Sequence, residues 1–289
     1  MRIAHNISGM NTSRNQGIVK GKLGKSLEKL SSGYRIVRAG DDAAGLAISE
    51  GMRSQIAGLN QAMRNTEDGV GMVNTGEGAL QEVHAMLHRL ETLAIESANG
   101  TFNSVARVNV DLEKKEIMEE IDRICKNTNF NENELFGSGE PTVPITPPEE
   151  SDTVTFQIGP SGEETMDVKR YLMSSKALGL MGKDGQTEME LGTPELANAA
   201  IDTIAQAVQA VTVVRSEFGA AQNHLDHTHN SLSVTAENMQ ASESRIRDTN
   251  MPDEFTNFTS QNILMQATVS MQSQANAVPQ SVLTLLQNA

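Results

Sequence analysis

An uninterrupted seven-residue apolar repeat in the last third of the chain constrains the fold more than any other feature. Apolar residues recur at every seventh position, at Ile204, Val211, Phe218, Leu225, Leu232, Met239 and Ile246. Three residues after each of the first six lies a small or β-branched residue, at Ala207, Val214, Ala221, Thr228, Thr235 and Ser242. Such a repeat on one helix implies supercoiling against partner helices, and small side chains let a partner approach closely. We therefore predict one long bundled helix over residues 199–247.

The N-terminal half supplies two partner helices for this rod. Between residues 51 and 99, apolar residues return at helical spacing until the stop at Asn99-Gly100. A further helix is predicted over residues 108–126. Its apolar face is expected to carry Leu112, Ile117, Ile121 and Ile124. The predicted fold class is mainly α, an elongated antiparallel helical bundle or coiled coil.

Composition excludes several classes of protein. Aromatic residues make up 3 % of the chain, there is no Trp, and there are 15 Met. A globular enzyme core of this length normally uses more large aromatic side chains. The net charge of −14 makes nucleic acid an unsuitable partner, although charge alone does not separate a polymerising subunit from any other acidic protein. No apolar run approaches about 20 residues, so no membrane insertion is expected.

The middle of the chain breaks the helical pattern. Residues 137–152 (GSGEPTVPITPPEESD) are rich in Pro and acids and are predicted to form a loop. Residues 153–159 and 163–168 alternate around Pro160-Ser161-Gly162, which predicts a small β-hairpin. Thr193 is expected to cap the C-terminal rod, with Pro194 at its first helical position.

Each end of the chain carries a further amphipathic segment. The N-terminal one contains Gly17, Gly21 and Gly24, and each Gly costs about 1 kcal/mol relative to Ala inside a helix. Such a helix is marginal alone, so we expect its order to come from neighbours. The apolar residues expected to make the assembly contacts of the two ends are Ile3, Ile7, Leu27, Leu30, Phe255, Phe258, Leu285 and Leu286.

No residue pattern supports catalysis or a cofactor. No HExxH, GxxxxGK[ST], GxGxxG or GxSxG motif occurs. The single cysteine, Cys125, lies among apolar residues and is expected to be a buried, inert thiol. His224, His227 and His229 cannot all face one ion, because His229 lies about 200° round the helix from His227. We therefore expect no enzyme activity and no metal site.

Two long segments carry a family pattern. Residues 27–80 (LEKLSSGYRIVRAGDDAAGLAISEGMRSQIAGLNQAMRNTEDGVGMVNTGEGAL) resemble the N-terminal region of bacterial flagellins. The runs ENMQASESRIRDTNMPDEF and QANAVPQSVLTLLQ are similar to the C-terminal region of the same family. The chain passes from the hairpin to Thr193 through a short connection, so it resembles a short, Firmicutes-type flagellin without the variable outer domains.

The resemblance implies an organisation into four stretches. Residues 1–42 and 254–289 would form the inner terminal domain that lines the channel of a filament. Residues 43–189, with the Pro-rich loop and the hairpin, and residues 190–253 would form the rod domain around it. The paired terminal helices would complete a mainly α fold.

The resemblance also implies function, location and partners. It implies a structural subunit that polymerises with itself into the extracellular flagellar filament after type III export, with no cleaved signal peptide. Its other implied partners are an export chaperone at the C-terminal segment and the cap and hook-junction proteins. Residues Arg89, Leu93 and Glu113 match positions that the innate receptor Toll-like receptor 5 reads in the family, and contact between subunits is their expected primary role. The alternatives are a hook–filament junction protein and, from another class, a non-catalytic helical metal-binding protein.

Overall fold

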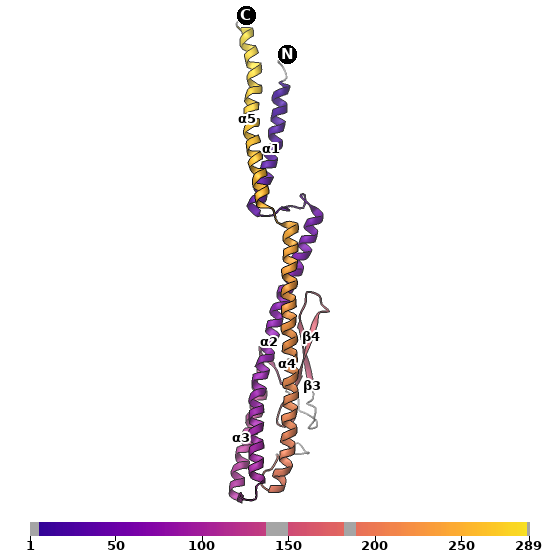
Figure 1. The fold of residues 1–289 in the computed structure, drawn as a ribbon, viewed down its shortest axis with the longest axis vertical. Helices are drawn as coiled ribbons and strands as arrows, with labels where there is room; N and C mark the ends of the chain where they lie inside the picture. Colours follow the sequence, from indigo (N-terminus) through magenta and orange to yellow (C-terminus); the bar gives the residue numbers. More distant parts are fainter. Residues whose placement is uncertain (1–5, 137–149, 182–188, 288–289) are drawn as a thin grey trace. The chain divides into compact units, whose positions relative to one another are not determined.

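The computed structural model describes residues 6–136, 150–181 and 189–287 of the chain (Figure 1). The elements in order are α1 (Ile7–Ser32), α2 (Ala43–Ala98), α3 (Ser104–Asn127), β1 (Asn129–Phe130), β2 (Asn133–Glu134), β3 (Glu150–Gln157), β4 (Thr165–Tyr171), α4 (Pro194–Arg247) and α5 (Met251–Gln287). The chain divides into two compact units, which we call the terminal unit (Met1–Ile56 with Glu237–Ala289) and the central unit (Ala57–Ala236). The predicted mainly α class, with a small hairpin and paired terminal helices, is confirmed.

The helices begin where polar side chains cap them. Thr193 precedes α4 as predicted, and its Oγ1 accepts from the Leu196 N–H at 3.4 Å. The helix α2 begins at Ala43, eight residues before the predicted start, because Asp42 Oδ1 accepts from the Gly45 N–H at 2.9 Å. The apolar pattern alone did not indicate this first turn.

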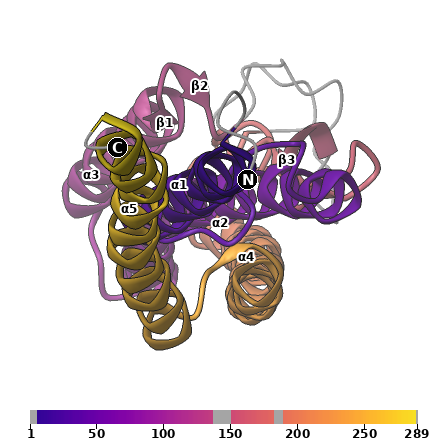
Figure 2. The ribbon, with the colours of Figure 1, turned by 90° about the horizontal axis from the view of Figure 1, so that it is seen from above.

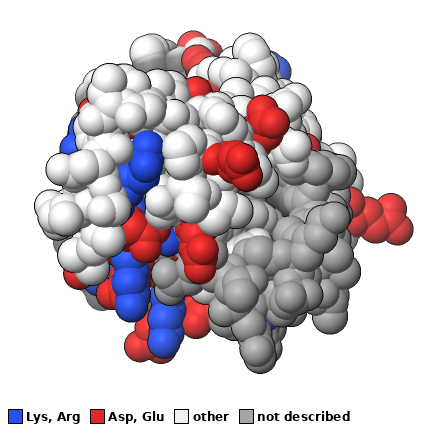
Figure 3. Space-filling model, turned by 90° about the horizontal axis from the view of Figure 1, so that it is seen from below, with Lys and Arg blue, Asp and Glu red and all other residues white. Residues whose placement is uncertain are grey.

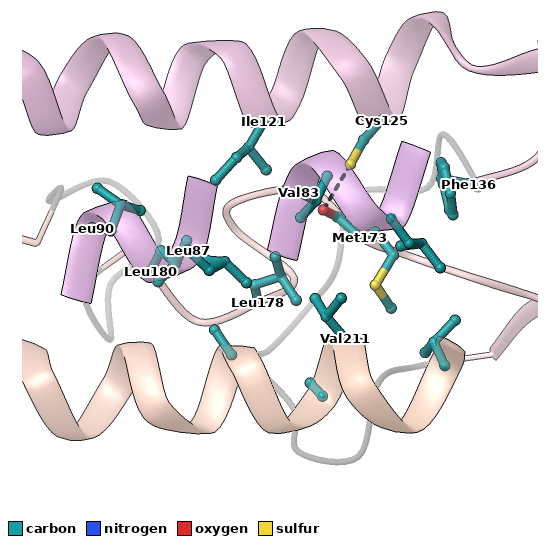
Figure 4. Packing of buried hydrophobic residues seen from close by; sticks show 14 of the residues in the cluster. Val83, Leu87, Leu90, Ile121, Cys125, Phe136, Met173, Leu178, Leu180 and Val211 are labelled. Carbon is teal, nitrogen blue, oxygen red and sulfur yellow. Dashed lines mark hydrogen bonds between the residues drawn. The ribbon is translucent and has the colours of Figure 1, made fainter. Parts of the chain in front are cut away.

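The core of the central unit is built mainly by α2, α3, α4 and the segment that follows β4 (Figure 4). Strand β4 and the residues directly after β2 also contribute. The labelled side chains that meet there are Val83, Leu87 and Leu90 of α2, Ile121 and Cys125 of α3, Val211 of α4, Phe136 after β2, and Met173, Leu178 and Leu180 after β4. From the sequence we predicted only a short connection between the hairpin and α4. That residues of this connection are buried in the core was not predicted.

The seven-residue seam of α4 is buried along its first half. Its first four members, Ile204, Val211, Phe218 and Leu225, are buried in the central core. Its last three members, Leu232, Met239 and Ile246, are half-buried. The apolar repeat therefore extends past Leu225, where the side chains of the seam are no longer fully buried by the described residues.

The predicted apolar face of α3 is correct except for Leu112. Ile121 is buried and Ile117 and Ile124 are partly buried against the central core, whereas Leu112 is 59 % exposed. The fully buried residues of α3 are Val110, Lys114, Met118, Ile121 and Cys125. The Lys114 Nζ donates to the Met189 carbonyl at 2.5 Å and lies 3.0 Å from Asp111 Oδ1, which compensates the buried charge.

The hairpin forms where the alternation predicted it. Strands β3 and β4 are antiparallel, with Val154 opposite Val168 and Phe156 opposite Met166. The strand β3 begins at Glu150, so the last three residues of the predicted loop belong to the sheet, and residues 137–149 lie outside the described part. The Tyr171 hydroxyl of β4 donates to the Glu217 carboxylate of α4, which holds the hairpin against that helix.

The terminal unit pairs the two ends of the chain. Helices α1 and α5 lie side by side in both views (Figures 1 and 2). The Asn6 amide donates to the Ala275 carbonyl at 2.9 Å, and the Ser26 hydroxyl donates to Glu254 Oε1 at 2.5 Å. These polar contacts join residues more than 220 positions apart in the chain.

Within the same unit, Arg247 at the end of α4 contacts several residues from other segments. Its Nη1 donates to Glu50 Oε1 at 2.6 Å, and its guanidinium lies 4.8 Å from the centre of the Tyr34 ring. The Arg35 N–H also donates to the Arg247 carbonyl at 2.7 Å. The hydrogen bond from Arg247 lowers the pKa of Glu50.

Candidate assembly surface

The terminal helix pair exposes most of its large apolar side chains. Within α1 only Gly9 and Ser26 are buried, and no described side chain of α5 is buried. Apolar side chains that are 45–66 % exposed are Ile7, Met10, Ile18, Leu27, Met251, Phe255, Ile263, Leu264, Val269, Met271 and Val278. Exposed apolar surface of this extent marks an interaction site rather than a solvated surface.

The exposed residues of α5 do not share one face. At 100° per residue, Ile263 lies about 80° round the helix from Phe255, and Leu264 lies about 180° from it. A helix that is apolar on all sides is normally buried on all sides. Since α1 covers only one side of α5, the remaining sides need neighbours from outside this chain.

The predicted terminal contacts fall into three groups. Ile7, Leu27 and Phe255 are exposed by more than half, at 58 %, 55 % and 61 %. Leu30 and Phe258 are half-buried, and the Phe258 ring centre lies 6.4 Å from that of Phe255. Ile3 and the side chains of Leu285 and Leu286 lie outside the described part of the chain.

Three of the four glycines of α1 face open space within the described residues. A Cβ added at Gly17, Gly21 or Gly24 would meet no described atom within 4 Å. By contrast, a Cβ added at Gly9 would lie 2.7 Å from the Asn6 amide and 3.3 Å from Asn276 of α5. Gly9 is therefore the glycine of α1 at which a side chain would press on α5.

The central unit carries a second exposed apolar group, which we call the α3 stripe. Val105, Val108 and Leu112 are 59–68 % exposed and follow one another at spacings of three and four on α3. That spacing places them on one face of the helix, opposite its buried face. Figure 3 views the molecule from the end at which α2 ends and α4 begins, and uncharged residues cover much of this face.

Of Arg89, Leu93 and Glu113, which were expected to contact the receptor, not all are exposed. Arg89 of α2 donates from Nε to Glu113 Oε1 of α3 at 2.7 Å, and both side chains are about half exposed. Leu93 is 1 % exposed and belongs to the central core. The three residues therefore form a half-exposed Arg–Glu pair and a buried Leu.

The described residues contain no group of three or more His, Cys, Asp and Glu that could hold a metal ion. His224 and His227 are exposed, and His229 lies 3.2 Å from Glu67 Oε1. Cys125 is buried as expected, and its Sγ–H donates to the Met173 carbonyl at 3.0 Å. Among the described helices, none combines the length and the apolar character that crossing a membrane requires.

Two family models match most of the chain. The model described as bacterial flagellin N-terminal helical region matches residues 3–140, and that of the bacterial flagellin C-terminal helical region matches residues 201–286. The chain is 44 % identical over 288 residues to a flagellin of Halalkalibacterium halodurans and 40 % identical over 304 residues to a flagellin of Bacillus subtilis. It is 41 % identical over 293 residues to a flagellar filament 31.3 kDa core protein of Treponema maltophilum. Each alignment covers 99 % of this chain and 100 % of the relative.

Solved structures resemble the chain less closely. A putative flagellar hook-associated protein from Vibrio parahaemolyticus has a TM-score of 0.58 at 17 % identity, covering 72 % of this chain and 100 % of that one. This likeness concerns the fold alone. A crystal structure of Bacillus cereus flagellin is 30 % identical, with a TM-score of 0.49, and covers 62 % of this chain and 94 % of that one.

Proposed function

The chain belongs to the bacterial flagellin family, and from this premise we propose that its terminal unit drives polymerisation. Members of the family are structural subunits of the extracellular flagellar filament and are not enzymes. The function of the chain is therefore self-assembly, which depends on residues that contact neighbouring subunits. The observation that carries the proposal is the helix α5, whose apolar side chains point to several sides while α1 covers one.

The mechanism couples ordering of the ends to association. In a free subunit, burial within the α1–α5 pair is too small to offset the conformational entropy of ordering two long helices. Contact with neighbouring subunits covers side chains such as Phe255, Ile263 and Ile18, which removes their apolar surface from water. The α3 stripe adds a second contact area in the central unit.

A charge placed on α5 tests this mechanism. Phe255 is 61 % exposed and lies outside the central unit, so Phe255→Asp leaves the central unit folded but places a carboxylate in the subunit interface. Purified protein is seeded with flagellar fragments and examined by electron microscopy. We expect no elongation from Phe255→Asp and normal filaments from Ser161→Asp, which adds the same charge at the exposed hairpin turn.

Filaments of normal length from Phe255→Asp would overturn the assembly mechanism. The same experiment separates the filament subunit from a hook–filament junction protein. A junction protein would form caps or no polymer even from the unaltered chain, whereas a filament subunit forms long hollow polymers.

The family pattern also supports separate structural roles for the terminal and central parts of the chain. We propose that residues 1–42 and 254–289 line the filament channel, while residues 43–189 and 190–253 form the surrounding rod. Without variable outer domains, the filament surface would be smooth. The same family pattern supports export through the type III apparatus without cleavage, chaperone binding at the C-terminal segment, and contact with the cap and hook-junction proteins.

Recognition by Toll-like receptor 5 is a second proposed function of the central unit. Its support is the half-exposed Arg89–Glu113 pair, because Arg side chains are frequent anchors of protein interfaces. Leu93 contributes by packing beneath the pair rather than by direct contact, since it is buried.

A receptor reporter assay on monomeric protein tests this function. We expect Arg89→Ala to reduce the response at least tenfold. Arg123→Ala, which removes the Arg of a similar exposed pair with Glu120 on α3, is expected to retain it. An equal response from Arg89→Ala and the unaltered chain would contradict the proposal.

A further inference from the structure

We propose that His84 and His88 on α2 form a binding site for one divalent transition-metal ion. The two histidines are one helical turn apart, so their side chains lie on the same face of α2. Their Nε2 atoms are 3.1 Å apart, and the ring centres are 4.6 Å apart with the planes nearly perpendicular. The ring nitrogens that point toward each other are thus positioned to share one partner.

The separation of the two nitrogens matches simultaneous coordination. Imidazole nitrogen lies about 2.0–2.1 Å from Zn²⁺, and two such ligands at angles of about 90° to 109° are about 2.9 to 3.4 Å apart. The Nε2–Nε2 distance falls inside that interval. Zn²⁺, Ni²⁺ and Cu²⁺ are the candidate ions, because imidazole is a suitable ligand for each of them.

A carboxylate orients one of the two rings. Glu91 Oε2 lies 3.2 Å from His88 Nδ1, where it accepts the Nδ1–H. In neutral imidazole this leaves the lone pair of His88 on Nε2, the atom that faces His84. Metal-bound histidines typically donate their second ring N–H to such an acceptor, which fixes the tautomer and makes the ligand more basic.

The charges around His84 also permit a cation. The groups that act on it are His88, Arg215 of α4 and Glu77. Arg215 is held by Glu77 Oε1 at 2.6 Å, which offsets its repulsion of an ion. Burial is the main cause that lowers the pKa of His84.

Within the described residues, His84 Nδ1 is buried and forms no hydrogen bond. Coordination of an ion through Nε2 requires the proton of the neutral ring to be on Nδ1.

The ion would have two protein ligands and would complete its coordination with water. No group of three or more metal-binding side chains exists in the described residues, which distinguishes this site from a closed structural zinc centre. His88 is 54 % exposed, so an ion can enter from solvent and exchange. Because both ligands lie on one helix, binding stabilises the folded helix by mass action.

Calorimetric titration of the full-length monomeric subunit with Zn²⁺ tests this site. A double variant, His84→Gln with His88→Gln, defines the background from other groups. We expect one ion per chain above that background. Because His88 is exposed, His88→Gln keeps the helix, which circular dichroism checks, and it should weaken binding at least tenfold. Glu91→Gln should weaken it severalfold through the loss of the acceptor on His88.

His227→Gln is the matched control, because it removes an exposed helical histidine that has no histidine four residues away. Its affinity should stay within twofold of that of the unaltered chain. Binding by His88→Gln within twofold of the unaltered chain, or an equal loss in His227→Gln, would overturn the site. The site would also be overturned if the unaltered chain and the double variant gave the same titration. The contact between the two rings would then be only a hydrogen bond.

Discussion

Gly76 of α2 lies directly beneath the ring of Phe218 of α4, so that a Cβ at position 76 would stand 2.6 Å from Phe218 Cε2. Phe218 belongs to the seven-residue seam and is buried, so its ring cannot move freely. We expect Gly76→Ala to lower the free energy of unfolding of the central unit by about 1 to 3 kcal/mol through overpacking. Chemical denaturation measures the change.

Gly78, two residues further on, supplies the control. It is exposed, and a Cβ there would meet nothing within 4 Å. Gly78→Ala should therefore raise stability by about 0.5 to 1 kcal/mol through helix propensity alone. Equal effects of the two substitutions would show that the ring of Phe218 does not constrain position 76.

The turn between β1 and β2 contains a strained residue that substitution can relieve. Asn131 and Glu132 have φ values of 51° and 66°, in the left-handed region. Asn tolerates that region, whereas Glu does so at a cost. We expect Glu132→Gly to raise stability by about 1 kcal/mol, measured as an increased midpoint of denaturation. Glu134→Gly, which lies in β2, should instead have no stabilising effect.

The thiol of Cys125 should be inert in the folded chain. Burial, with a smaller contribution from the Asp122 carboxylate, raises the pKa of this thiol to about 12. We expect iodoacetamide to leave it unmodified at about pH 8 in native protein and to modify it fully in denaturant. Mass spectrometry of the alkylated chain reports both states, and rapid native labelling would contradict the burial.

The same thiol predicts a loss of stability at high pH. Above about pH 9 the unfolded thiol loses its proton while the folded thiol retains it, so the unfolded state is favoured. The contribution of the thiol is therefore complete below pH 9 and is lost as pH rises toward 12. The free energy of unfolding of the unaltered chain should fall more steeply over this interval than that of Cys125→Ala.

The glycines of α1 should affect the free chain and the polymer in opposite directions. Since a Cβ at Gly21 meets nothing within the chain, Gly21→Ala should increase the helicity of the free subunit, measured by circular dichroism. If neighbours approach the helix backbone in the filament, the added methyl hinders them and seeded elongation slows. Unchanged elongation would show that this face of α1 stays open in the polymer.

Much of the fold could be predicted because long periodic patterns report which side of a helix is buried. The seam from Ile204 to Leu225 and the cap at Thr193 both follow from spacing and from local backbone chemistry. The hairpin could also be predicted, since its alternation is a local signal.

What could not be predicted depends on contacts between distant residues. Met173 and Leu180 have no periodic neighbours, and they are buried because three helices enclose their segment. The burial of Lys114 on α3 was missed because its Nζ is paired with a carbonyl 75 residues away, which no helical pattern encodes. The spacing of His84 and His88 places both on one face of α2, but the distance between their ring nitrogens cannot be obtained from spacing alone.

The exposed apolar surface of α5 has a thermodynamic consequence. Burying such surface in a polymer gives association a negative heat-capacity change, because the water that covered it is released. Hydrophobic association of this kind weakens on cooling. Filaments held together through α5 would therefore lose subunits in the cold, and calorimetry of assembly at several temperatures would record the slope.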